Sequence, residues 1–129
     1  MSLALDAPYD PAVANVRSRI DGNLGVVEMT GRLTINDQPG VLKEAVADLV
    51  AKGARNVLVD LSGVPYIDST RLGELIAAHV TVTRQGGRLK LLRTPARVVD
   101  LLVLAGLGDV FERFDSVEHA ARSFTDGQA

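Results

Sequence analysis

The chain has 129 residues, which suits one domain, and a domain of this size buries about two thirds of the surface of its unfolded chain. It has no cysteine, which excludes disulfide bonds and thiolate metal sites. The formal net charge is −2 with both signs interspersed, which argues against direct nucleic-acid binding. The sequence shows neither an apolar run long enough to cross a bilayer nor a secretory signal, so we expect a soluble cytoplasmic protein without membrane insertion.

The first half of the chain predicts an arm, a hairpin and a helix. Residues 1–12 contain two prolines and little periodicity, and we expect a flexible N-terminal arm. Two strand patterns, at 16–20 and 24–29, flank the turn signal Asp21-Gly22-Asn23 and predict a β-hairpin. Residues 34–39 then offer helix caps and a proline. The apolar stripe of the first helix, which Gly53 ends, is Val41, Leu42, Ala45, Val46, Leu49 and Val50.

Strands and helices alternate in the second half. The third strand is expected at 55–61, where the stretch from Val57 to Leu61 is apolar and β-branched, as in a central strand buried on both faces. The next helix is expected from Ser69 to about Gln85, where Gly86 and Gly87 end it. The later elements expected are a strand at 88–92, a helix capped by Thr94, an edge strand at 110–114 and a helix capped by Ser116.

The predicted order is β-β-α-β-α-β-α-β-α, which indicates an α/β fold. A leading hairpin followed by βαβ units gives a mixed β-sheet covered by about four helices. We expect the helices after the third and fourth strands to be the main cover of this sheet. Residues 13–125 form a single domain in this interpretation, and residues 126–129 form a frayed tail.

The stretch 57–76 joins the central strand to its helix. Ser62-Gly63-Val64-Pro65 breaks the strand, and Asp68-Ser69-Thr70 are residues that cap helices. Either Asp68 or Ser69 is therefore expected at the tip of a helix, on the rim where the central strand ends. In open α/β sheets, ligands and partners usually meet the protein at that rim.

Residues 57–60, then Ile67-Asp68-Ser69-Thr70 and Leu72-Gly73, resemble the signature of STAS domains of the anti-sigma-factor antagonist family. The resemblance covers residues 16–124 in order and spacing. It implies a bacterial phosphoprotein that regulates transcription by partner switching. The implied partner is an anti-sigma factor that is also a serine kinase of kinase-like ATPase fold, and Ser69 is the implied phosphorylation site. The partner-binding residues implied are Asp68, Ser69, Thr70, Arg71, Gly31 and Arg32.

The sequence departs from the family pattern at two places. Arg71 stands where the family usually has glycine, and Arg32-Leu33-Thr34 matches the upstream turn of the family only loosely. Several roles stay open for Arg71: a solvated side chain, a pair with Glu74 or Asp68, or an obstacle to the kinase. It could also neutralise a phosphate on Ser69 or contact an acidic partner. Ser69 itself could serve only as a helix cap, and Thr70 is a second hydroxyl beside it.

Two other functions compete with the antagonist interpretation. A STAS domain without a switch could serve as a subunit of a phospholipid-transport or stress-signalling assembly. An enzyme with Ser69 as nucleophile would need an adjacent base, and the sequence offers none, so we expect no enzyme activity and no cofactor. His79 is expected to be a partly buried packing residue and His119 to be exposed, and the two make no metal-ligand pattern. A weak homodimer stays open.

Overall fold

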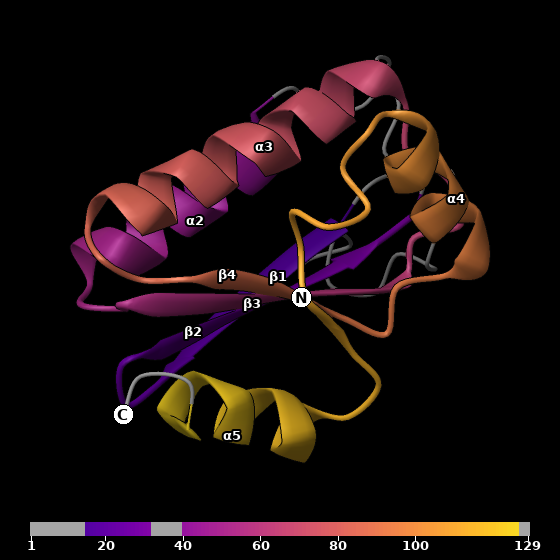
Figure 1. Cartoon of the computed structure of the whole chain (residues 1–129). Coiled ribbons are helices and arrows are strands. Elements are labelled where there is room, and N and C mark those ends of the chain that lie inside the picture. The colour runs from indigo at the N-terminus through magenta and orange to yellow at the C-terminus, as the bar shows by residue number, and fades with distance from the viewer. Residues whose placement is uncertain (1–14, 32–39, 127–129) are drawn as a thin grey trace, which may run out of the picture.

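The computed structural model describes residues 15–31 and 40–126, which form one five-stranded sheet with helices on both faces (Figure 1). The strands lie in the order β1-β2-β3-β4-β5, so neighbours in the chain are neighbours in the sheet. The strands are β1 (Asn15–Asp21), β2 (Leu24–Thr30), β3 (Asn56–Gly63), β4 (Leu89–Leu92) and β5 (Arg113–Phe114). The helices are α2 (Val41–Ala51), α3 (Ser69–Arg84), α4 (Ala96–Leu104) and α5 (Val117–Asp126). The predicted α/β fold is confirmed.

The first two strands form the predicted antiparallel hairpin, with Asp21 opposite Leu24. Gly22 in its turn has a φ of +64°, which glycine adopts without steric cost. The pairs β2–β3, β3–β4 and β4–β5 are parallel. Parallel neighbours need a crossover connection, and α2, α3 and α4 supply it here. The carboxyl ends of β2, β3 and β4 therefore lie at the same end of the sheet.

Strand β3 is the middle strand and is buried on both faces, as the apolar run from Val57 to Val59 predicts. Successive side chains of a strand point to opposite faces. Val57, Val59 and Leu61 accordingly belong to the larger core cluster, and Leu58 belongs to a smaller cluster on the α5 side. Every residue from 56 to 61 is buried, so this strand is the centre of both cores.

Helices α2 and α3 lie side by side over one face of the sheet, and α5 lies under the other face (Figure 1). We expected the helices after β3 and β4 to be the main cover. Instead α2 shares that role with α3, while α4 is a helix of nine residues that buries only Val98 and Leu102. The residues that α2 and α3 contribute to the larger core are Leu42, Val46, Leu49, Leu72, Leu75, Ala78 and Val82.

A buried lysine joins α5 to the sheet. Lys90 in β4 is 3% exposed, and its Nζ lies 3.1 Å from the Oγ of Ser123 in α5. The same nitrogen lies 3.5 Å from a carboxylate oxygen of Glu112 and 4.6 Å from the centre of the Phe124 ring. A buried charge is costly unless it is paired. The hydroxyl, the carboxylate and the aromatic face together satisfy this ammonium group and hold α5 in place.

Three predicted boundaries differ from the structure. Thr94 is not the cap of α4: Pro95 is the N-cap, because its ψ of 149° is extended and the helix starts only at Ala96. Strand β5 covers two residues instead of five, because it pairs with β4 only at Leu91 and Leu92. Helix α5 continues to residue 126, where we expected the tail to begin. The predicted cap Ser116 is confirmed, since its Oγ accepts a hydrogen bond from the His119 N–H at 3.1 Å.

Some predictions fall on other parts of the chain. The arm at 1–12 and the caps predicted at 34–39 lie outside the described residues. Within residues 15–31 and 40–126, no helix has the length and apolar character needed to span a bilayer.

Two leucines of α4 provide a matched test of the core. Leu102 is fully buried and Leu104 is 84% exposed, although they lie two residues apart on the same helix. We expect Leu102→Ala to lower the free energy of unfolding by about 2–5 kcal/mol because it leaves a cavity. Leu104→Ala should change it by less than about 0.5 kcal/mol. Urea denaturation of both variants measures this difference, and equal effects would contradict the placement of α4.

Candidate functional site: the start of helix α3

The loop that leaves β3 is fixed at both of its ends. The Val64 N–H donates to the Leu61 carbonyl oxygen at 2.9 Å, and the Ser62 N–H donates to the Asp60 carboxylate at 2.9 Å. Ile67 is 2% exposed and anchors the far end of the loop in the larger core. The loop therefore delivers the next residue, Asp68, to a defined position beyond the carboxyl end of β3.

Asp68 is the N-cap of α3. Its backbone is extended, with φ −92° and ψ 176°, and its Oδ1 accepts a hydrogen bond from the Arg71 N–H at 2.9 Å. The sequence did not decide whether Asp68 or Ser69 is the N-cap of α3, and the structure shows that it is Asp68. Ser69 is consequently the first helical residue, and its hydroxyl is not needed to cap the helix.

Ser69 and Thr70 are both exposed at the start of α3. The first N–H groups of a helix lack intrahelical partners, and the helix dipole makes this end partly positive. An anionic group attached to the Ser69 side chain would thus lie at the end of the helix that favours negative charge.

Arg71 is not a solvated surface residue, because it is only 4% exposed. Its Nη1 is hydrogen-bonded and ion-paired to the Oε2 of Glu74, so the Glu74 pair is the role that the structure shows among those left open. The same Oε2 accepts a hydrogen bond from the Gly40 N–H at 3.1 Å, at the start of α2. Arg71 therefore lies beneath the exposed start of α3 and connects it to α2.

The end of β2 lies beside the loop that follows β3. The Gly31 N–H donates to the Gly63 carbonyl oxygen at 2.9 Å, and Gly31 has a φ of +86°. A Cβ atom at Gly63 would lie 2.6 Å from the Cγ2 of Thr30, so this close approach requires glycine. The structure thus brings Gly31 to the end of β3, where the β3–α3 loop begins. Arg32 lies outside the described residues.

The predicted histidine roles are confirmed. His79 is partly buried, and its ring packs edge-to-face on Phe111 with centroids 5.3 Å apart. His119 is exposed and packs in the same way on Phe114. Among the described residues, no three His, Cys, Asp or Glu side chains are grouped so that they could hold a metal ion.

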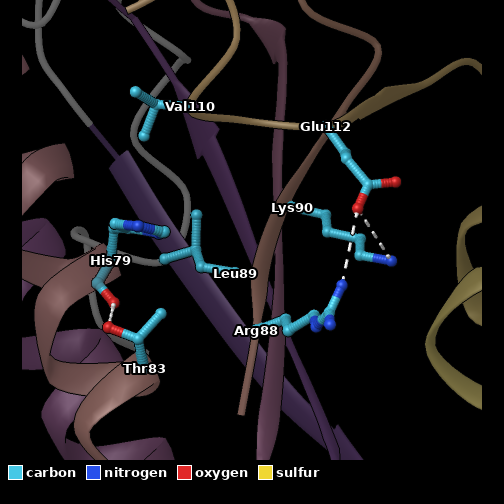
Figure 2. A pocket seen from close by; sticks show the side chains of 7 residues that line it. All are labelled: His79, Thr83, Arg88, Leu89, Lys90, Val110 and Glu112. Atoms are coloured by element: carbon cyan, nitrogen blue, oxygen red, sulfur yellow. Dashed lines mark hydrogen bonds and ion pairs between the residues drawn. The ribbon is translucent and has the colours of Figure 1, made fainter. Parts of the chain in front are cut away.

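A groove of about 220 Å³ lies between α3, β4 and the segment that precedes β5, and Figure 2 shows its lining. The Thr83 hydroxyl in this groove bonds to the His79 carbonyl oxygen at 2.9 Å, and Glu112 faces Arg88 and Lys90. His79 stands ten residues along α3 from Ser69, which is about 15 Å along the helix axis. His79 is therefore too far from Ser69 to act as a base for it. The Thr83 hydroxyl is hydrogen-bonded to the backbone of its own helix.

Comparison with known proteins agrees with this geometry. Residues 15–120 match the family model of the STAS domain. The chain belongs to the STAS domain family. It is 34% identical over 86 residues to an anti-sigma-B factor antagonist of Bacillus subtilis (strain 168), a match that covers 67% of this chain and 77% of that protein.

The solved structures support the same fold for this STAS domain. An anti-sigma factor antagonist from Mycobacterium paratuberculosis superposes with a TM-score of 0.77 at 20% identity, over 91% of this chain and 98% of that one. SpoIIAA in its unphosphorylated form gives a TM-score of 0.68 at 18% identity, over 88% of this chain and 97% of that one. The phosphorylated form of SpoIIAA gives a TM-score of 0.63 at 15% identity, over 89% of this chain and 100% of that one.

Two features of the site are not indicated by the sequence of this STAS domain: the burial of the Arg71–Glu74 pair and its contact with Gly40. The spacing of Arg71 and Glu74 permits an ion pair on one helix face, but it does not indicate that the pair is buried. The contact between Glu74 and Gly40 joins residues 34 positions apart, and no local pattern predicts it.

The cap of α3 can be tested by substitution at Asp68. We expect Asp68→Ala to lower the free energy of unfolding by about 0.5–2 kcal/mol, because the Arg71 N–H loses its acceptor. Asp68→Asn retains an acceptor oxygen and should recover most of that loss. Thermal or urea denaturation of both variants measures this, and an Asp68→Ala variant as stable as wild type would show that another group caps the helix.

Proposed function

We propose that this STAS domain is an anti-sigma-factor antagonist of the cytoplasm. It binds an anti-sigma factor of kinase-like ATPase fold while Ser69 is unmodified, and phosphorylation of Ser69 by that partner releases it. One observation carries the proposal: an exposed serine occupies the first position of a helix that is capped by its neighbour Asp68. The similarity to the Bacillus subtilis antagonist supports the identity of the partner.

The position of Ser69 suits a phosphate. A phosphoserine carries a charge of about −1.5 to −2 and three acceptor oxygens. At a helix N-terminus such an anion is stabilised by about 0.3–1 kcal/mol, so the modification need not unfold α3. SpoIIAA, whose fold this chain shares, has been solved in both unphosphorylated and phosphorylated forms, which supports a phosphate on this fold.

The switch acts on the partner. A phosphate on Ser69 adds a dianion next to the Asp68 carboxylate and makes the docking surface strongly negative. Closing a protein interface removes water from such charges, and charge that finds no matching partner opposes binding. The unmodified hydroxyl has no such cost, so binding and release follow the phosphorylation state.

The proposed docking surface combines Asp68, Ser69 and Thr70 with the end of β2. Gly31 lies against the β3–α3 loop through its hydrogen bond to Gly63, and Arg32 follows it in the chain. Arg71 is too deeply buried for a direct contact of its side chain in this arrangement, so we assign it a supporting role beneath the surface. The domain acts by binding and not as an enzyme.

Affinity capture of the tagged chain from its own cells, with mass spectrometry of partners and bait, tests the proposal. We expect an anti-sigma factor of kinase-like fold together with bait phosphorylated at Ser69. If the same partner is recovered but Ser69 of the bait carries no phosphate in any growth condition, the protein is an antagonist that phosphorylation does not switch. Recovery of a phospholipid-transport complex or a stress-signalling assembly instead would overturn the proposed function.

Substitutions at Ser69 separate binding from switching. Ser69→Ala should bind the anti-sigma factor like wild type and lose phosphorylation. Ser69→Glu should bind roughly tenfold more weakly or worse, because unmatched charge at an interface costs about 1.4 kcal/mol or more. Calorimetry measures the affinities, and incubation with the kinase and ATP measures the modification.

Thr70 provides the matched control for these substitutions. Thr70→Ala removes the neighbouring exposed hydroxyl and should leave both phosphorylation and binding intact. Tight binding by Ser69→Glu would contradict the charge switch. If Thr70→Ala loses phosphorylation and Ser69→Ala keeps it, the phosphorylated residue is Thr70 and not Ser69.

A further inference from the structure

The Glu74 carboxylate joins the starts of two helices. Its Oε2 accepts a hydrogen bond from the Gly40 N–H at 3.1 Å and is paired with the Arg71 guanidinium. Glu74 lies in the second turn of α3, and Gly40 is the N-cap of α2. The residues are far apart in the sequence, so this contact is a tertiary link between the helices.

The start of α2 needs such a link. The first N–H groups of a helix have no intrahelical acceptor. Gly40 has no side chain that could cap the helix, and it occupies the left-handed region with φ +80°. A carboxylate is favoured at this partly positive end. Helix α3 thus supplies, through Glu74, an acceptor for the Gly40 N–H and a negative charge at the start of α2.

Arg71 holds this carboxylate in place. The side chains of Arg71 and Glu74 are 5% and 14% exposed, so salt and water screen their attraction only weakly. The Arg71 N–H is bonded to Asp68, the neighbour of Ser69. A continuous set of contacts therefore runs from Asp68 through Arg71 and Glu74 to Gly40.

We infer that Arg71 and Glu74 are positioning residues of the docking surface. Their pair fixes the start of α3, which carries Asp68, Ser69 and Thr70, against the start of α2, so this part of the docking surface is held in one position before the partner binds. Because a preformed surface loses less conformational freedom on binding, loss of this pair should weaken docking. The inference rests on the proposed function for its partner, whereas the link to Gly40 can be measured on the chain alone.

The first experiment follows the Gly40 amide by NMR in the full chain. Glu74→Ala removes the acceptor, and Glu74→Gln keeps the shape but removes the charge. We expect the Gly40 amide proton to shift upfield and exchange about tenfold faster in Glu74→Ala, as for a lost hydrogen bond to a charged group, with a smaller effect in Glu74→Gln. An unchanged Gly40 signal in Glu74→Ala would overturn the inference.

Asp48→Asn is the matched control. It removes the carboxylate of an exposed pair between Asp48 and Lys52 on α2, at 2.9 Å, and it should leave the Gly40 signal as in wild type. A Gly40 shift of equal size in this variant would show that any charge change near α2 moves the signal, and this too would contradict the specific role of Glu74.

The second experiment measures affinity for the kinase-type anti-sigma factor. We expect Glu74→Ala and Arg71→Ala to bind about fivefold or more weakly, Arg71→Lys to recover part of the loss, and Asp48→Asn to match wild type. Near-wild-type affinity in a variant with a released Gly40 amide would overturn the positioning role. Failure of wild type to bind would overturn the proposed function and the docking role together. The NMR signal of the Gly40 amide would still show whether Glu74 accepts its hydrogen bond.

Discussion

Burial of β3 on both faces is the constraint on which the rest of this structure depends. An apolar strand of this kind is stable only when helices cover both sides of it. Helices α2 and α3 cover one side and α5 covers the other (Figure 1). The parallel crossovers that contain α2 and α3 also place the carboxyl ends of β2 and β3 at the same end of the sheet. The docking surface proposed for this STAS domain is therefore a product of the same packing that buries β3.

The charges at the start of α3 are arranged so that the charge of the exposed surface can change while the packing beneath it stays the same. Asp68 already satisfies a helix N–H, and Arg71 is matched by Glu74 beneath the surface. The Ser69 hydroxyl takes part in neither contact set, although it is adjacent to both. Modification of that hydroxyl can therefore alter the potential of the surface while the hydrogen bonds that shape it stay in place.

Local patterns predicted the fold and the place of Ser69, because both follow from short-range features. The hairpin is marked by Asp21-Gly22-Asn23, and the start of α3 is marked by residues that cap helices. The cover of the sheet by α2 was missed, since apolar stripes show which face of a helix is buried but not how much of the sheet it covers. The buried roles of Arg71, Glu74 and Lys90 were not predictable either, because charged residues are usually exposed and only tertiary packing reveals the exceptions.

The anchoring of α5 by Lys90 has a consequence for how this domain can be joined to other chains. Parallel strands give the sheet a polarity, and Ser69 follows the carboxyl end of β3. Helix α5 runs the opposite way, so that Thr125 and Phe124 share a hollow with Asp21 and Asn23, near the amino end of β3. A protein fused after α5 would consequently be attached at the opposite pole from Ser69, and it would leave the proposed docking surface free.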